Sequence, residues 1–191
     1  MQNFNSNVWL KIMQPLNYQA ILDCAELLFD EQTCKLALER MADEIIATMK
    51  DEFPVVLPIM GGAVVFAGQL LPLLRFPLDF DYAHVSRYGD KLVGGSFEWS
   101  RLPSIDLNGR NVLILDDILD EGFTLAAVKK KVLELGAKSC RCAVFANKIL
   151  EYEKPIRADF VGLDVPNRYV FGYGMDVSGA WRNLPAIYAV K

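Results

Sequence analysis

The fourteen residues 112–125, VLILDDILDEGFTL, constrain the fold more than any other part of this chain. They open with four apolar residues, which is typical of a strand buried on both faces of a parallel sheet. Helical spacing follows at Leu125, Val128, Val132 and Leu135. The pattern therefore predicts a strand, a turn at Gly122 and a helix, which together are the repeating unit of α/β folds.

Acidic residues gather at this junction. Asp116 and Asp117 follow the apolar run, and Asp120 and Glu121 lie in the turn. Ligands of open α/β sheets bind at the carboxyl ends of the strands, so we expect these acids to face a ligand and not the core. Backbone N–H groups at a helix start are unpaired, and Gly122 lets the main chain approach an anion closely. The turn is predicted to hold a phosphate.

Two other interpretations fit an apolar strand that ends in two aspartates. P-loop nucleotide hydrolases hold magnesium in this way. However, no GxxxxGK[ST] sequence occurs in the chain, so this interpretation fails. The second is an aspartate that only caps a solvated strand end. The length of the motif and its strand, turn and helix context favour a phosphate and ribose site.

The same residues resemble the phosphoribosyl pyrophosphate signature of the type I phosphoribosyltransferase family. Four further segments resemble the hypoxanthine-guanine branch of that family, in the same order along the chain. They are a pyrophosphate loop at 58–62, the start of a mobile loop at 86–89, a purine-recognising lysine segment at 146–148, and a base-stacking and magnesium segment at 166–182. The resemblance spans residues 55–184, and the first fifty residues carry little of it.

The remaining chain alternates between predicted helices and strands. A helix is predicted at 32–50, with one apolar face made by Leu38, Met41, Ala42, Ile45 and Met49. Strands are predicted at 55–59, 78–88, 112–115, 140–146 and 160–163, with helices after Gly62 and Gly122. This alternation predicts an α/β fold with a doubly wound, mainly parallel sheet. We expect residues 1–191 to form a single domain, because no repeat or linker divides them. The resemblance implies a type I phosphoribosyltransferase-like fold with a small hood formed by the N-terminal segment and about 165–191.

Composition excludes several classes of protein. With 52% hydrophobic residues among 191, the chain has enough apolar material for one substantial core. The net charge of −4 argues against nucleic-acid binding. Cys24, Cys34, Cys140 and Cys142 form no CxxC pair, so we expect buried thiols in a reducing compartment and no metal there. The only histidine, His84, lies in an alternating strand pattern and is expected to be structural.

Residues 54–74 carry no charge and are about as long as a membrane span. Prolines and glycines interrupt them at Pro58, Gly61, Gly62, Gly68 and Pro72. We therefore predict a buried strand, a Gly-Gly turn and a helix, with no membrane span. The N-terminus lacks the pattern of a signal peptide, which predicts a cytoplasmic location. A chain of this size and apolar content also favours a homodimer or homotetramer.

The resemblance implies transfer of a phosphoribosyl group from phosphoribosyl pyrophosphate to a 6-oxopurine base, with release of pyrophosphate and with Mg²⁺ as the cofactor. It assigns the ribose hydroxyls to Asp116 and Asp117. It assigns the proton at N7 of the base to Asp120, as the catalytic residue. The 5′-phosphate would be bound by backbone amides and the Thr124 hydroxyl, at Asp120, Glu121, Gly122, Phe123 and Thr124.

The resemblance assigns the other substrate groups to residues far apart in the sequence. It assigns pyrophosphate binding to Met60, Gly61 and Arg182. It assigns purine binding to Lys148, Tyr169 and Val170. It assigns metal binding to Asp176 together with Asp116 and Asp117. Ser86, Arg87 and Tyr88 would begin a mobile loop, and we expect residues 86–100 to close over the site and exclude water.

Three residues depart from the family pattern. Met60 and Phe123 stand where relatives often carry basic residues, and Glu121 stands where they commonly carry a small hydroxyl residue. A carboxylate facing the phosphate would repel it, so we expect Glu121 to point outward. Relatives hold a cis peptide bond in the pyrophosphate loop, which the resemblance places between Ile59 and Met60.

Two alternatives stay open at the level of sequence. A regulator can keep this fold and use the site only to sense a ligand, because fold does not fix function. The acidic composition and the presence of Asp120 favour an enzyme. Within enzymes, the sequence leaves the preference among hypoxanthine, guanine and xanthine open.

Overall fold

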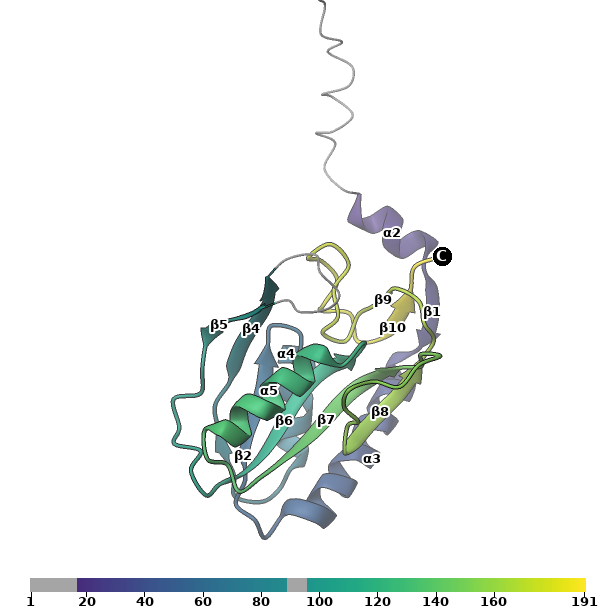
Figure 1. The fold of residues 1–191 in the computed structure, drawn as a ribbon. Helices are drawn as coiled ribbons and strands as arrows, with labels where there is room; N and C mark the ends of the chain where they lie inside the picture. Colours follow the sequence, from purple (N-terminus) through teal and green to yellow (C-terminus); the bar gives the residue numbers. More distant parts are fainter. Residues whose placement is uncertain (1–16, 89–95) are drawn as a thin grey trace, which may run out of the picture.

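The computed structural model describes residues 17–88 and 96–191. Its centre is a seven-stranded sheet in which β5, β4, β2, β6, β7 and β8 lie side by side, with β3 paired to β2 (Figure 1). Only the β4–β5 pairing is antiparallel, so the predicted mainly parallel sheet is confirmed. The strands are β2 (Val55–Met60), β3 (Asp79–Phe80), β4 (Ala83–Tyr88), β5 (Ser96–Arg101), β6 (Asn111–Leu119), β7 (Ser139–Lys148) and β8 (Phe160–Val165).

Helices cover both faces of this sheet (Figure 1). One face packs on α3 (Glu31–Met49), α4 (Val64–Leu70) and the short 3₁₀ turn η1 (Leu71–Leu73), and the other face packs on α5 (Phe123–Glu134). The side chains of β6 alternate between these two layers. Leu113 and Leu115 join the α3 and α4 side, whereas Val112 and Ile114 join the α5 side. This explains why residues 112–115 are all apolar, since neither face of the strand meets water there.

The helix α3 forms where the sequence predicts it. Asp30 caps its start by accepting a hydrogen bond from the Thr33 backbone N–H at 2.8 Å. Its buried residues follow helical spacing and include all five of the predicted apolar face: Leu38, Met41, Ala42, Ile45 and Met49.

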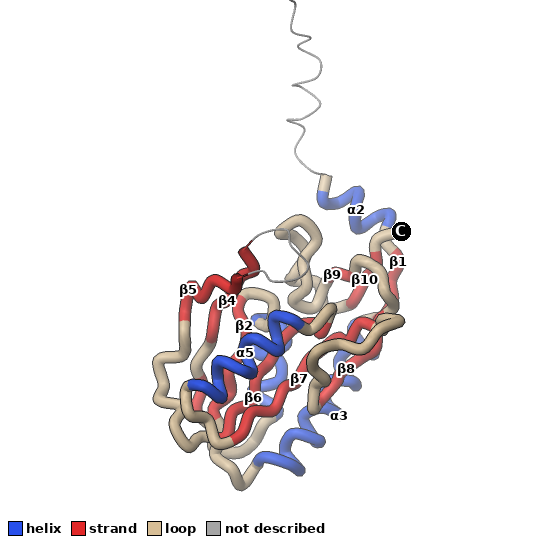
Figure 2. The backbone as a smooth tube through the Cα atoms, viewed as in Figure 1, coloured by secondary structure: helices blue, strands red, loops and turns tan. Residues whose placement is uncertain are grey.

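A second, three-stranded sheet joins an early segment of the described residues to the C-terminal part of the chain. It contains β1 (Glu26–Phe29), β10 (Ile187–Ala189) and β9 (Val170–Phe171), all antiparallel, and α2 (Tyr18–Cys24) precedes it. Figure 2 shows this small sheet beyond the carboxyl ends of the main strands. The Trp181 indole N–H donates to the Tyr18 carbonyl oxygen at 2.8 Å and ties α2 to the C-terminal loop. The predicted hood is therefore present.

Two predicted strands differ from the structure by more than one or two terminal residues. The strand predicted at 78–88 is interrupted at Asp81, whose buried carboxylate accepts hydrogen bonds from the backbone N–H groups of Tyr82, Ser104 and Ile105. The strand predicted at 112–115 continues to Leu119, because β7 keeps pairing with it as far as Asn147. Asp116 and Asp117 therefore lie inside the last part of a strand.

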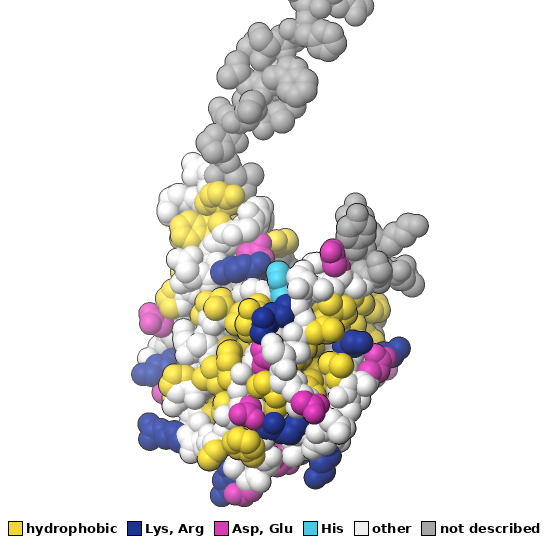
Figure 3. Space-filling view, turned by 90° about the vertical axis from the view of Figure 1, so that its left-hand side faces the viewer, with side chains coloured by type: hydrophobic (Ala, Val, Ile, Leu, Met, Phe, Trp, Pro, Cys, Tyr) yellow, Lys and Arg dark blue, Asp and Glu magenta, His cyan; other side chains and the backbone are white. Residues whose placement is uncertain are grey.

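The predicted division of residues 54–74 is confirmed, because they form β2, a turn, α4 and η1. Within residues 17–88 and 96–191, no helix has the length and apolar character needed to cross a membrane. Cys34, Cys140 and Cys142 are buried as predicted. Cys24 is exposed, against the prediction, because it ends a helix that buries none of its residues. On the face drawn in Figure 3, acidic and basic side chains are scattered, with no basic patch.

Candidate active site

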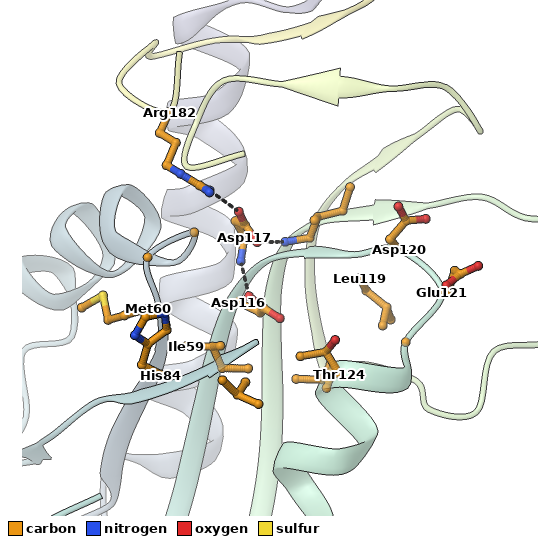
Figure 4. Close-up of a pocket in the computed structure, with 16 residues that line it drawn as sticks. Ile59, Met60, His84, Asp116, Asp117, Leu119, Asp120, Glu121, Thr124 and Arg182 are labelled. Carbon is orange, nitrogen blue, oxygen red and sulfur yellow. Dashed lines mark hydrogen bonds and ion pairs between the residues drawn. The ribbon is translucent and has the colours of Figure 1, made fainter. Parts of the chain in front are cut away.

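A pocket of about 420 Å³ lies at the carboxyl ends of β2 and β6 and the N-terminus of α5 (Figure 4). It gathers residues from the pyrophosphate loop, β4, the β6 turn and the C-terminal loop. Nine of its lining residues are among the predicted site residues: Met60, Gly61, Asp116, Asp117, Asp120, Glu121, Gly122, Thr124 and Arg182. Phe123 is not among the lining residues, and its side chain is exposed.

A second pocket of about 200 Å³ adjoins the first. It is lined by the three predicted purine residues and the predicted metal residue Asp176, and it shares three residues with the first pocket. Its lining is Asp117, Ile118, Asp120, Lys148, Tyr169, Val170, Met175 and Asp176. The structure thus brings the predicted phosphoribosyl and purine residues into two neighbouring pockets, with Asp120 at their border.

The two aspartates at the end of β6 are each only 9% exposed. The Asp117 backbone N–H donates to Asp116 Oδ1 at 3.1 Å. Burial raises the pKa of Asp116 well above its ordinary value, and the charge of Asp117 raises it further. Burial also raises the pKa of Asp117, although hydrogen bonds from Asp116 and Ile118 and the charge of Arg182 oppose this. Simultaneous ionisation of both groups is therefore unfavourable without a cation.

Close packing holds the pyrophosphate loop against this pair. A side-chain carbon added to Gly62 would overlap the Asp117 carboxylate, and one added to Gly174 would overlap the Gly62 carbonyl oxygen. Gly174 also has φ of +105°, a conformation that L side chains rarely adopt. Glycine is therefore required at both positions for the loop, β6 and the C-terminal segment to meet.

Arg182 bridges two of the predicted metal residues. Its Nη2 lies 2.6 Å from Asp176 Oδ1, and its Nη1 lies 3.9 Å from Asp117 Oδ2. Figure 4 shows the guanidinium reaching from the C-terminal loop toward Asp117. Asp176 also accepts a hydrogen bond from the Gly179 backbone N–H at 2.7 Å. Asp176 is therefore already engaged by protein donors.

The carboxylates suit Mg²⁺ in their chemistry. Mg²⁺ is commonly held by one or two carboxylates, with waters and substrate phosphates completing its shell. Asp116 and Asp117 offer such oxygen donors, and a nearby cation would favour their charged forms. In the described part of the chain, no three acidic, histidine or cysteine side chains group closely enough to hold a metal by themselves. The donor set therefore fits a metal shared with a phosphate-bearing ligand.

The turn after β6 has the form that an anion site requires. Gly122 adopts φ of +88° and directly precedes α5, and an added side-chain carbon would lie 3.2 Å from Ile156 Cγ2. Figure 4 shows Thr124 at the pocket, while the Glu121 carboxylate points away from Asp116 and Asp117. This agrees with the outward orientation expected for Glu121.

An ion pair crosses the border between the two pockets. Lys148, at the end of β7, donates from Nζ to Asp120 Oδ2 at 2.6 Å. Tyr169 is 57% exposed and Val170 lies in β9, so the hood supplies the opposite wall. An aromatic side chain left exposed beside a pocket has a free face for stacking.

Lys154, which sequence reasoning missed, lies beside the site and lines neither of its two pockets. Its Nζ donates to the Leu119 carbonyl oxygen at 2.7 Å and to Asn147 Oδ1 at 2.8 Å. It thereby joins the residue before Asp120 to the residue before Lys148. Burial lowers the pKa of Lys154. Lys154 belongs to no motif, so only its contacts in the fold reveal this position.

Two expectations in this region need correction. The cis peptide bond expected between Ile59 and Met60 lies between Met60 and Gly61, because Met60 still pairs with His84 and the chain turns only after it. His84, expected to be structural, is exposed and lines the larger pocket.

The expected mobile loop lies partly in strands. Ser86, Arg87 and Tyr88 belong to β4 and pair with Glu98, Phe97 and Ser96 of β5, since the two strands form an antiparallel pair. They are therefore in a strand and not in a loop. The middle of the expected loop, 89–95, lies outside the described residues.

Comparisons with known proteins match this geometry. The family described as phosphoribosyl transferase domain matches residues 25–178. The hypoxanthine-guanine phosphoribosyltransferase of Bacillus subtilis strain 168 is 32% identical over 171 residues, which cover 88% of this chain and 94% of that protein. The hypoxanthine-guanine-xanthine phosphoribosyltransferase of Tritrichomonas foetus is 30% identical over 172 residues, which cover 88% and 93% of the two chains.

Solved structures share the fold as well. A hypoxanthine-guanine phosphoribosyltransferase from Bacillus anthracis aligns with a TM-score of 0.82 and 26% identity, over 87% of this chain and 98% of that one. The family match takes in every strand of the main sheet and both pockets' acidic residues. The chain therefore belongs to the phosphoribosyl transferase domain family, within the group that contains the hypoxanthine-guanine phosphoribosyltransferases.

Proposed function

We propose that this protein transfers the phosphoribosyl group of phosphoribosyl pyrophosphate to hypoxanthine or guanine, which gives IMP or GMP and pyrophosphate. The observation that carries this proposal is the pair of adjoining pockets that meet at Asp120. One pocket has the anion-binding turn and the carboxylates for a phosphoribosyl group. The other has a lysine, an exposed tyrosine and a backbone edge for a base. The names of the relatives support purine bases as acceptors.

The base preference follows from the Lys148 and Asp120 pair. In a 6-oxopurine, the O6 acceptor and N7 are neighbours on one edge of the base. Lys148 Nζ can donate only, whereas the Asp120 carboxylate accepts when ionised. The pair, 2.6 Å apart, thus offers a donor for O6 beside an acceptor for an N7 proton. Adenine carries an amino donor at this edge, which would oppose the lysine.

The reacting centre is placed by residues of the larger pocket. As pyrophosphate leaves, the anomeric carbon develops positive charge, and carboxylates that face it stabilise that charge. Asp116 and Asp117 hold the ribose, and the amides of the 120–124 turn with the Thr124 hydroxyl hold the 5′-phosphate. Arg182 contacts the departing pyrophosphate. Asp120 accepts the N7 proton as the new bond to the base forms.

Asp116 and Asp117 would hold Mg²⁺ together with substrate oxygens, and Asp176 would reach it through water. The ion would neutralise charge on the pyrophosphate and so ease its departure. Arg182 would then be released from Asp176 toward the pyrophosphate. The raised pKa values of the buried pair support this placement, because a cation would offset the repulsion between the two carboxylates.

A panel of acceptor bases tests the proposal. Nucleotide formation from phosphoribosyl pyrophosphate would be measured with hypoxanthine, guanine, xanthine and adenine in turn, with and without Mg²⁺. We expect metal-dependent turnover of hypoxanthine and guanine and none of adenine. Turnover of xanthine alone would assign the protein to a xanthine-preferring activity. Binding of phosphoribosyl pyrophosphate without turnover of any base would favour a ligand-sensing role.

A further inference from the structure

His84 is the only histidine in the chain, and it lies at the pocket without a role in the reaction described above. It is exposed near the start of β4, and its Cα partner across the parallel β2–β4 pairing is Met60 of the pyrophosphate loop. Figure 4 shows the imidazole beside Met60, on the opposite side of Asp116 from Thr124. Among residues 17–88 and 96–191, no hydrogen bond or ion pair is made by the His84 side chain, while its backbone lies in the strand pairings of β4. Its ring nitrogens are therefore available to a ligand.

The side chains that line this pocket supply little positive charge for an anionic ligand on the His84 side. Four carboxylates line it, at Asp116, Asp117, Asp120 and Glu121, against a single arginine. That arginine, Arg182, is already paired with Asp176. A pyrophosphate group carries several negative charges, and anions in a pocket of this kind need donors or cations close by. The neighbouring Met60 can donate a hydrogen bond only from its backbone, because its side chain has no donor.

We infer that His84 binds the pyrophosphate group of the substrate and of the product, and supplies the side-chain donor that Met60 lacks. A neutral imidazole offers one N–H donor and an imidazolium offers two, both suited to phosphate oxygens. The pocket thus has a phosphate end at the turn before α5 and a second anion end between β2 and β4. This inference rests on the proposed function and names a further binding residue for it.

Inorganic pyrophosphate is the probe that isolates this contact. Its affinity would be measured by calorimetry, with and without Mg²⁺, for the wild-type protein, His84→Ala and His84→Arg. Loss of a hydrogen bond to a charged group predicts about tenfold weaker binding in His84→Ala. His84→Arg should recover most of this loss, because it restores a donor at the same place. Lys130→Gln, which removes an exposed cation of α5 that lines neither pocket of the site, should bind as the wild type does.

Steady-state kinetics separates binding from a structural effect. His84→Ala should raise KM for phosphoribosyl pyrophosphate by about tenfold while KM for hypoxanthine stays within about twofold. Equal pyrophosphate affinity in His84→Ala and wild type would overturn the inference. So would equal losses for both substrates with a lowered melting temperature, since that would mark a structural residue. Wild-type protein that binds pyrophosphate but makes no nucleotide would overturn the proposed function and leave this contact intact.

Discussion

Lys148 Nζ lies 2.6 Å from Asp120 Oδ2, so the proposed donor for the base and the proposed acceptor for its proton form an ion pair at the border of two pockets. The lysine side chain is 11% exposed and the aspartate 50% exposed. The lysine side chain is therefore mostly buried, whereas the aspartate side chain is accessible to a ligand. The proposed purine edge would meet both groups at this border.

Replacing Lys148 tests the base-reading part of this pair. In Lys148→Met, kcat/KM for hypoxanthine should fall by about 10- to 100-fold, because a hydrogen bond from a charged donor is lost. KM for phosphoribosyl pyrophosphate should change little, and discrimination against adenine should narrow. Lys130→Met is the matched control, since that side chain is exposed on α5 away from both pockets. A parallel loss for both substrates would contradict a role in base recognition.

Gly62 should tolerate no side chain. In Gly62→Ala the new methyl group would overlap the Asp117 carboxylate, and relief of that overlap would displace the pyrophosphate loop. We expect about 1 to 3 kcal/mol lower stability to urea and weaker binding of phosphoribosyl pyrophosphate. Gly68→Ala in α4 is the control, because nothing lies within 4 Å of the added carbon. That control should gain about 0.5 to 1 kcal/mol from helix propensity.

Asp81 gives the protein a pH-dependent contribution to stability. Burial disfavours its charge, but hydrogen bonds from the backbone of Tyr82, Ser104 and Ile105 and from Arg101 prevail, and the pKa of Asp81 is lowered. A lowered folded-state pKa stabilises the fold above the unfolded value of about 3.9, and this stability is lost as pH falls through the folded pKa.

The measurement for Asp81 is urea unfolding of the wild type and Asp81→Asn at several pH values. At pH 7 the variant should be about 1 to 3 kcal/mol less stable, and the difference should shrink below about pH 4. A difference of the same size at pH 7 and at pH 3 would show that the charge of Asp81 contributes nothing.

Local patterns predicted the elements that position the site. The apolar run before Asp116 marked the central strand, and the residues from Leu125 onward marked the helix after the turn. These signals are strong because a strand between two layers and a helix with one buried face each require a fixed apolar pattern.

What the sequence could not show depends on partners far along the chain. The strand through Asp116 extends to Leu119 only because β7 pairs with it there. Asp81 interrupts a predicted strand because it bonds to residues near Ser104. Loop placement brings Lys154 to Leu119 beside the site, and strand placement brings His84 to the larger pocket, while no local motif surrounds either residue.

The most direct test of the account is a comparison of wild type and Asp120→Asn with hypoxanthine, phosphoribosyl pyrophosphate and Mg²⁺ in single-turnover experiments. The asparagine keeps the size of the side chain and removes the proton acceptor. We predict IMP formation about 10²- to 10⁴-fold slower in the variant, with binding of phosphoribosyl pyrophosphate largely retained. Equal rates of IMP formation in the two proteins would contradict proton transfer at the border of the two pockets.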